Sequence, residues 1–126
     1  MPSSADAARD AVVRAIIALE RSCLEAESAF VERRWPDVEV AFGRQAALTG
    51  DLGRLFAAAP ETSPVHDPKV ARRVRGIIAY RDDQLRRMRA YHDDVATRLR
   101  SIGKVNALAR TIRRRTAGGH LVDGQF

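Results

Sequence analysis

The 126-residue chain contains a single cysteine, Cys23, so no disulfide can form within it. Aromatic residues make up only 6% of the chain, and no stretch approaches the roughly 18 apolar residues of a transmembrane helix. The N-terminus lacks a basic segment leading into an apolar run, which argues against a cleaved signal peptide. We therefore expect a protein without a membrane span, in the cytoplasm rather than in an oxidising compartment.

Residues that favour β-strands never cluster with the period-two alternation of a half-buried strand. Ala, Leu and Arg dominate instead, and the chain is long enough for one helical domain, residues 1–126. We predict an all-α fold: an elongated antiparallel helical bundle with a two-helix hairpin, one long third helix and a flexible C-terminal tail.

Side chains with metal or catalytic chemistry are few and poorly spaced. Asp82-Asp83 and Asp93-Asp94 recur eleven residues apart, roughly 16 Å along a helix, which is too far to share one metal ion. The chain has no Glu-x-x-His pair, no phosphate-binding glycine loop and no nucleophile elbow. The histidines are not spaced as metal ligands: His66, His92 and His120. We predict no enzymatic activity, no cofactor and no metal site.

Small helical mutases of the chorismate type are one enzymatic alternative, because they hold dicarboxylates with basic residues inside a helical core. Such a site requires several Arg or Lys residues at seam positions. Arg81 alone interrupts the predicted seam of the third helix, whereas Arg14 and Arg21 fall beside the seam of the first. A single candidate does not make a site, so this alternative is not favoured.

Three helices are predicted, at about residues 4–34, 36–58 and 67–115, with a linker at 59–66 and a tail at 116–126. Ser3 followed by Asp6 fits a capping box for the first helix, and Asp67-Pro68 fits the start of the third. Pro36 opens the second helix directly after the first. Because that connection is very short, the first two helices should be antiparallel neighbours.

Apolar residues step by three and four along each helix, which is typical of helices that pack together. The first seam is Val12, Ile16, Leu19, Cys23, Ala26 and Phe30, widened by Ile17, Leu24 and Val31. The second is Val38, Ala41, Gln45, Leu48, Leu52 and Leu55, with glycines at 43, 50 and 53 inside the helix. Those glycines indicate close backbone approach, a loose helix or a break near Thr49-Gly50-Asp51. We expect burial of Ile16, Phe30, Leu48, Leu52, Met88 and Val95.

The third helix cannot hide its apolar stripe within its own globule, since Asp67 to Ile102 alone would span roughly 50 Å. Its stripe, which continues from Val95 to Ile112, needs a partner. That partner is a client protein, a second copy of the chain, or the C-terminal end folded back. A homo-oligomer is one expected outcome.

Positive charge is concentrated in the second half of the chain. Residues 1–66 carry seven basic and ten acidic side chains, a net charge of −3, whereas residues 67–126 carry fifteen and six, a net charge of +9. Either an acidic hairpin packs beside a basic helix, or the basic face meets an acidic partner or nucleic acid. The most concentrated basic patch, which is the alternative phosphate site, is Arg110, Arg113, Arg114 and Arg115.

The C-terminal end is unusually apolar for a flexible tail, with Leu121, Val122 and Phe126 after Gly118-Gly119. A disordered tail cannot bury enough surface to benefit from apolar residues. We predict that these three residues dock onto this chain or another protein.

The segment AFVERRWPDVEVAFGRQAALTGDL, residues 29–52, resembles flagellar type III secretion chaperones of the FliT/FlgN type. The matching positions are a Trp that opens the second helix, an Arg-Gln pair and two leucines: Trp35, Arg44, Gln45, Leu48 and Leu52. Residues 82–85 resemble the acidic and Gln-containing part of the family's third helix. The chain departs from the family in its strong positive charge and in having Arg33-Arg34 where Gly-Asp is common.

This resemblance implies a cytoplasmic chaperone or adaptor that holds the amphipathic helical end of a secreted flagellar subunit in an apolar groove. It implies contact with the export machinery through the C-terminal region. The residues expected to line the client groove are Leu85, Met88, Tyr91, Val95, Leu99 and Ile102. The alternative is an Arg-rich nucleic-acid-binding protein or a self-associating structural protein.

Overall fold

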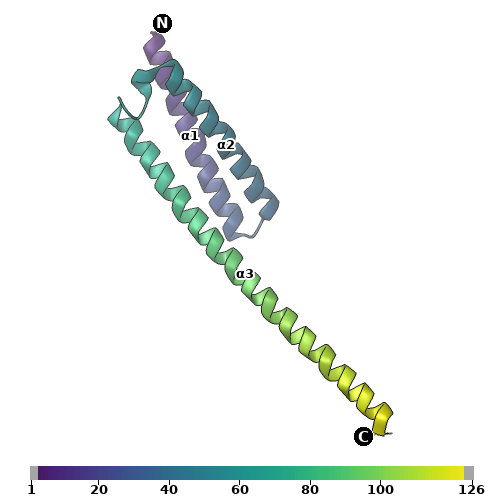
Figure 1. Ribbon diagram of the computed structural model, residues 1–126. Helices are drawn as coiled ribbons and strands as arrows, with labels where there is room; N and C mark the ends of the chain where they lie inside the picture. The colour runs from purple at the N-terminus through teal and green to yellow at the C-terminus, as the bar shows by residue number, and fades with distance from the viewer. Residues whose placement is uncertain (1–2, 124–126) are drawn as a thin grey trace. The chain divides into compact units, whose positions relative to one another are not determined.

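The computed structural model describes the backbone of residues 3–123 and the side chains of residues 3–116. Its elements are α1 (Ser4–Val31), α2 (Trp35–Ala58), the short 3-10 helix η1 (Pro60–Thr62) and α3 (Pro68–Asp123), as Figure 1 shows. Residues 3–123 contain no β-strand, which confirms the predicted all-α fold. None of the described helices combines the length and apolar character that a bilayer crossing requires.

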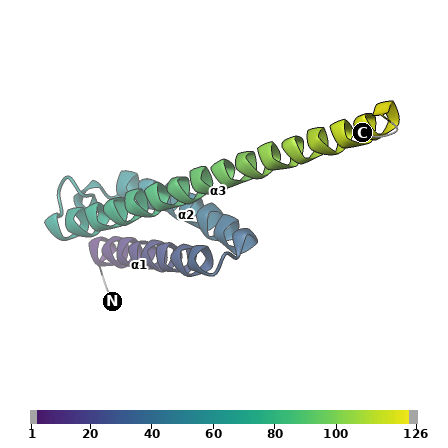
Figure 2. The ribbon, with the colours of Figure 1, turned by 90° about the horizontal axis from the view of Figure 1, so that it is seen from below.

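The contacts within the chain divide it into two units, Met1–Arg86 and Arg87–Phe126, with the boundary inside α3. We call these unit 1 and unit 2. In unit 1, α1 and α2 form the predicted antiparallel hairpin, and the first part of α3 lies beside it in both ribbon views (Figures 1 and 2). The backbones of α1 and α2 approach each other closely along their length, whereas α3 packs mainly through its side chains.

Side-chain caps lie at the N-termini of α1 and α3, at the two helix starts that the sequence predicted. The Ser3 hydroxyl accepts a hydrogen bond from the Asp6 backbone N–H at 3.1 Å, ahead of α1. The Asp67 carboxylate accepts from the N–H groups of Lys69 and Val70, at 3.0 and 3.4 Å, ahead of α3. Both caps satisfy N–H groups that have no partner inside the helix, so both predicted starts are confirmed.

The turn between α1 and α2 depends on Arg33, whose φ of 60° lies in the left-handed region that glycine normally occupies. Its N–H donates to the Phe30 carbonyl and the Arg34 N–H donates to the Ala29 carbonyl, a Schellman arrangement that ends α1. The Arg33 guanidinium also donates to the Phe30 carbonyl at 2.9 Å and stacks over the Phe30 and Trp35 rings. These contacts hold a non-glycine residue in a conformation that ordinarily costs free energy.

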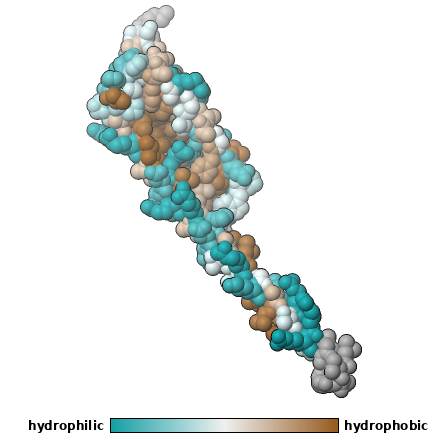
Figure 3. Space-filling model, in the orientation of Figure 1, coloured by the Kyte–Doolittle hydropathy of each residue, from teal (hydrophilic) through white to brown (hydrophobic). Residues whose placement is uncertain are grey.

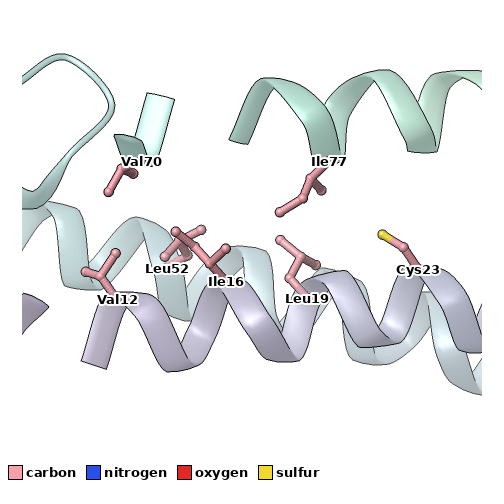
Figure 4. Close-up of a cluster of buried hydrophobic side chains, with 7 residues drawn as sticks. All are labelled: Val12, Ile16, Leu19, Cys23, Leu52, Val70 and Ile77. Carbon is pink, nitrogen blue, oxygen red and sulfur yellow. The ribbon is translucent and has the colours of Figure 1, made fainter. Parts of the chain in front are cut away.

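The hydrophobic core of unit 1 is built mainly from the α1 seam. Figure 4 shows the α1 side chains facing Leu52 of α2 and Val70 and Ile77 of α3. All six predicted α1 seam residues are buried: Val12, Ile16, Leu19, Cys23, Ala26 and Phe30. On α2 the buried seam residues are Val38, Ala41, Gln45 and Leu52, while Leu48 and Leu55 are partly exposed.

Three burial predictions were wrong, and the residues expected to widen the α1 seam lie outside it. Ile17, Leu24 and Val31 are exposed, because each follows a seam residue by one position and lies about 100° further round α1. Leu48, Met88 and Val95, which were predicted to be buried, are partly exposed.

Buried polar groups fix how α1 and α2 are aligned. The Ser22 hydroxyl donates to the Ala41 carbonyl at 3.0 Å, and the Gln45 side-chain amide donates to the Ser22 carbonyl at 3.3 Å. Ser22 and Gln45 are fully buried, so sliding one helix along the other would leave these groups without partners. At the surface, Arg44 forms an ion pair with Glu25 at 2.8 Å across the same helix pair.

Gly43 and Gly53, which are exposed, do not mark close backbone approach, since a Cβ built at either would meet nothing within 4 Å. Nor does α2 break near Thr49-Gly50-Asp51, because the helix is continuous from Trp35 to Ala58. Replacing Gly43 or Gly53 with Ala should therefore raise the free energy of unfolding by about 0.5–1 kcal/mol each. Urea denaturation measures this change, and a loss of stability at either position would contradict it.

The end of α3 differs from the prediction. A helix ending near Arg115 was expected, but α3 continues through Gly118 and Gly119 to Asp123. No proline follows Pro68, and each glycine costs only about 1 kcal/mol, so nothing in the sequence forces the helix to stop. Phe126 lies outside the described residues, as do the side chains of Leu121 and Val122, so docking by these residues stays a prediction.

Candidate helix-binding surface

A shallow groove of about 280 Å³ lies between α1 and the first part of α3, inside unit 1. Its lining is mostly apolar: Glu20, Cys23, Leu24, Arg73, Gly76, Ile77 and Tyr80. At its edge, Arg73 donates to the Glu20 carboxylate at 3.2 Å, which pairs the acidic hairpin with the basic helix. Because both side chains are more than a third exposed, this ion pair contributes little stability.

Cys23 forms part of the groove but is only 3% exposed. Burial raises the pKa of its thiol, a shift that the nearby Arg81 charge opposes and the Glu20 charge reinforces. A buried thiol with a raised pKa stays protonated at neutral pH and is a poor nucleophile. The residue packs as the small hydrophobic side chain that its seam position predicted.

Gln84 attaches α3 to α1 and was not recognised from the sequence. Its side-chain amide donates to the Cys23 carbonyl at 3.3 Å and to the Glu27 carboxylate at 3.1 Å, and the residue is fully buried. Gln84 lies between Ile77 and Met88 at the seam spacing, which is the signal that could have identified it. Within the described residues, its Oε1 atom and the Arg81 Nε atom have no hydrogen-bond partner.

The six residues predicted to line a client groove are all on α3, but they fall in both units. Leu85 belongs to unit 1, and the others, from Met88 to Ile102, belong to unit 2. Met88, Tyr91 and Val95 are partly exposed, and Leu99 and Ile102 are more than half exposed. Since α3 is the one helix described in unit 2, its residues form a helix face rather than a groove.

This apolar face extends further along α3 than the predicted client site. Its residues step by three and four: Val95, Arg98, Ile102, Val105, Ala109 and Ile112. We call this set the distal seam; Leu99 and Leu108 flank it on either side. Ile102, Val105, Ile112 and both flanking leucines are more than half exposed. Figure 3 shows apolar patches between hydrophilic surface on this part of the chain.

Basic side chains surround the distal seam. The four arginines of the alternative phosphate site, at positions 110, 113, 114 and 115, are all exposed. Arg110, Arg113 and Arg114 are spaced i, i+3 and i+4 and share one side of α3, whereas Arg115 lies about 100° further round the helix. Within the seam itself, Arg98 forms an ion pair with Asp94 at 3.1 Å.

Nothing in the described residues suggests a metal centre, since no group of three or more His, Cys, Asp or Glu side chains could hold an ion there. The residues that the structure does bring together are apolar and basic. Exposed apolar and basic side chains are typical of surfaces that contact other macromolecules. In comparisons with known proteins, no protein-family model, curated protein or solved structure matches this chain.

Proposed function

We propose that this chain is a cytoplasmic chaperone or adaptor that binds the amphipathic helical end of a secreted flagellar subunit. The observation that carries the proposal is the distal seam, an apolar face that remains exposed along several turns of α3. Monomeric soluble proteins seldom expose a contiguous apolar face of this kind unless it binds something. A second helix with apolar residues at the same three- and four-residue spacing is the simplest complement to it.

The sequence resemblance supplies the class of client. Residues 29–52 resemble flagellar chaperones, and the antiparallel hairpin, the proline-containing linker and the long third helix are compatible with that resemblance. In this proposal unit 1 is the folded support, and the distal seam with Leu99 and Leu108 makes the contact. Val95, Leu99 and Ile102 belong both to the predicted client site and to this surface.

The test replaces Ile102 and Val105 with Gln, which removes apolar contact while keeping a good helix former. The tagged chain is purified from its source cells with nuclease present, and bound proteins are identified by mass spectrometry. We expect a secreted flagellar subunit to be among the proteins that bind the unmodified chain. Affinity for that subunit should fall roughly 10- to 100-fold in the double variant, as expected for losing two partly buried aliphatic contacts.

Val65→Gln is the matched control, because Val65 is an exposed aliphatic residue in the linker of unit 1. This variant should retain the client. Capture that contains no secreted subunit, or capture that survives the Ile102/Val105 double substitution unchanged, would contradict the proposal.

The exposed arginines at positions 110–115 favour nucleic acid as a second candidate partner. Phosphate binding depends on counterion release, so its affinity falls steeply as salt rises. Helix binding through apolar contacts should persist in the same salt range. Loss of all binding after nuclease treatment, together with a steep salt dependence, would favour nucleic acid.

A further inference from the structure

The charge around the distal seam indicates which kind of helix fits it. Residues 87–116 carry nine basic and two acidic side chains, a net charge of +7, while the whole chain carries +6. We propose that the distal seam binds an acidic amphipathic helix, in which Asp or Glu residues flank apolar anchors at three- and four-residue spacing. This inference rests on the proposed function, because it names the class of helix that occupies the same surface.

Arg98 gives the most specific support, because it is the one charged residue of the distal seam. A helix that covers the seam removes water from the Arg98 guanidinium, and a charge that loses water requires a carboxylate partner. Asp94 supplies one carboxylate from the same helix, at 3.1 Å. An acidic residue of the bound helix, placed opposite Arg98, would supply the second, and arginine suits such paired recognition.

A second copy of this chain is a poorer occupant. Self-pairing would place one segment of charge +7 against another of the same charge. In a parallel pair Arg98 would face the Arg98 of the other copy, and in an antiparallel pair centred on residue 100 it would face Ile102. Neither of these two registers places a carboxylate directly opposite the guanidinium, so in both Arg98 is less well paired than it would be with an acidic partner.

Nucleic acid also fits the surface poorly. It would neutralise the arginines but leave the apolar side chains of the distal seam in water. Residues 92–116 contain no Phe, Trp or Tyr, so they offer no aromatic ring on which a base could stack. An acidic helix satisfies the apolar and the basic side chains at once.

The test uses three synthetic helical peptides of equal length with identical apolar anchors, whose flanking positions are all Glu, all Gln or all Lys. Binding to the full chain is measured by fluorescence anisotropy at low and high salt. Two or three surface ion pairs are worth about tenfold in affinity, so the Glu peptide should bind about tenfold more tightly than the Gln peptide. The Lys peptide should bind most weakly, and the differences should narrow as salt rises.

Substitutions of individual arginines show which side chains produce the preference for the Glu peptide. Arg113 and Arg115 flank the far end of the seam, so replacing both with Gln should weaken the Glu peptide severalfold and leave the Gln peptide unchanged. The control replaces Arg9 and Arg14 of α1, which are both exposed, with Gln. This change removes the same amount of charge and should leave the affinity for both peptides unchanged. Arg98→Leu should tighten the Gln peptide and reduce the preference for Glu.

The outcomes separate this inference from the proposed function. Equal affinity for the Glu and Gln peptides would overturn the acidic preference while leaving the distal seam as a helix-binding site. Failure of all three peptides, with sedimentation showing a dimer that Ile102→Gln dissociates, would overturn both and assign the seam to a second copy. Tighter binding of an RNA oligonucleotide than of any peptide, with a steep salt dependence, would also overturn both.

Discussion

Truncating Leu52 to Ala should lower the free energy of unfolding by roughly 2–5 kcal/mol. Leu52 lies on α2, is 5% exposed, and packs in the same cluster as Ile16 of α1 and Val70 of α3. Removing its side chain leaves a cavity that surrounding residues can fill only in part, so the cost exceeds the transfer free energy of the lost carbons. Urea denaturation, followed by circular dichroism, measures the change.

Leu99→Ala is the matched control, because it makes the same chemical change on α3 where the side chain is 63% exposed. It should change the free energy of unfolding by less than about 0.5 kcal/mol. A loss below about 1 kcal/mol for Leu52→Ala would mean that α2 lies at the edge of unit 1 rather than in its core.

Ile77→Ala should destabilise unit 1 by a similar amount, roughly 2–5 kcal/mol. Ile77 is 7% exposed and belongs to the core cluster with Leu19 and Cys23, so it tests whether the first part of α3 packs on the hairpin. The next residue, Ile78, is 53% exposed and provides a control with the same side chain on the same helix. Ile78→Ala should cost less than about 0.5 kcal/mol in the same denaturation experiment.

Equal losses for the two isoleucine variants would contradict the packing of Ile77 against the α1–α2 hairpin. A small loss for both would mean that the α1–α2 hairpin is stable without the first part of α3. We expect the first part of α3 to contribute to stability, because the buried Gln84 amide joins it to α1 through hydrogen bonds to the Cys23 carbonyl and the Glu27 carboxylate.

The α1 seam was the part of the fold most accessible from sequence. Its residues follow an uninterrupted 4-3-4-3-4 spacing, and α2 and α3 both pack on that same side. The flanking residues Ile17, Leu24 and Val31 have equally apolar side chains, so sequence alone could not show that they lie outside the contact. Periodicity finds the centre of a helix face, but the positions of neighbouring helices determine its width.

Two local features escaped prediction because tertiary contacts override the intrinsic preferences of the residues. Arg33 adopts a left-handed conformation that the sequence gives no reason to expect, and its stacking on Phe30 and Trp35 accompanies it. Gln84 is polar and so seemed to interrupt the α3 stripe, yet it is buried because a carbonyl and a carboxylate lie within reach. Its seam spacing indicates burial, but the polarity of its side chain favours exposure unless hydrogen-bond partners are known to lie nearby.

The apolar stripe of the third helix was predictable from the sequence, whereas the groove beside α1 was not. The sequence placed an apolar stripe on the third helix and expected partners along its length, and the structure exposes that stripe through Ile112. The predicted client groove stopped at Ile102 and included Leu85, which belongs to unit 1. The groove between α1 and α3 was not predicted, because it depends on Gly76 and Leu24 lying on facing helices.

Amide hydrogen exchange on the full chain, with and without the Glu-flanked peptide, tests the distal seam most directly. A bound helix should slow exchange across residues 95–112, where α3 has no packed neighbour within unit 2 among the described residues. Exchange in α1 and α2 should stay unchanged. If the peptide binds but residues 95–112 exchange as before, or if protection appears only in residues 4–58, the distal seam is not the helix-binding surface.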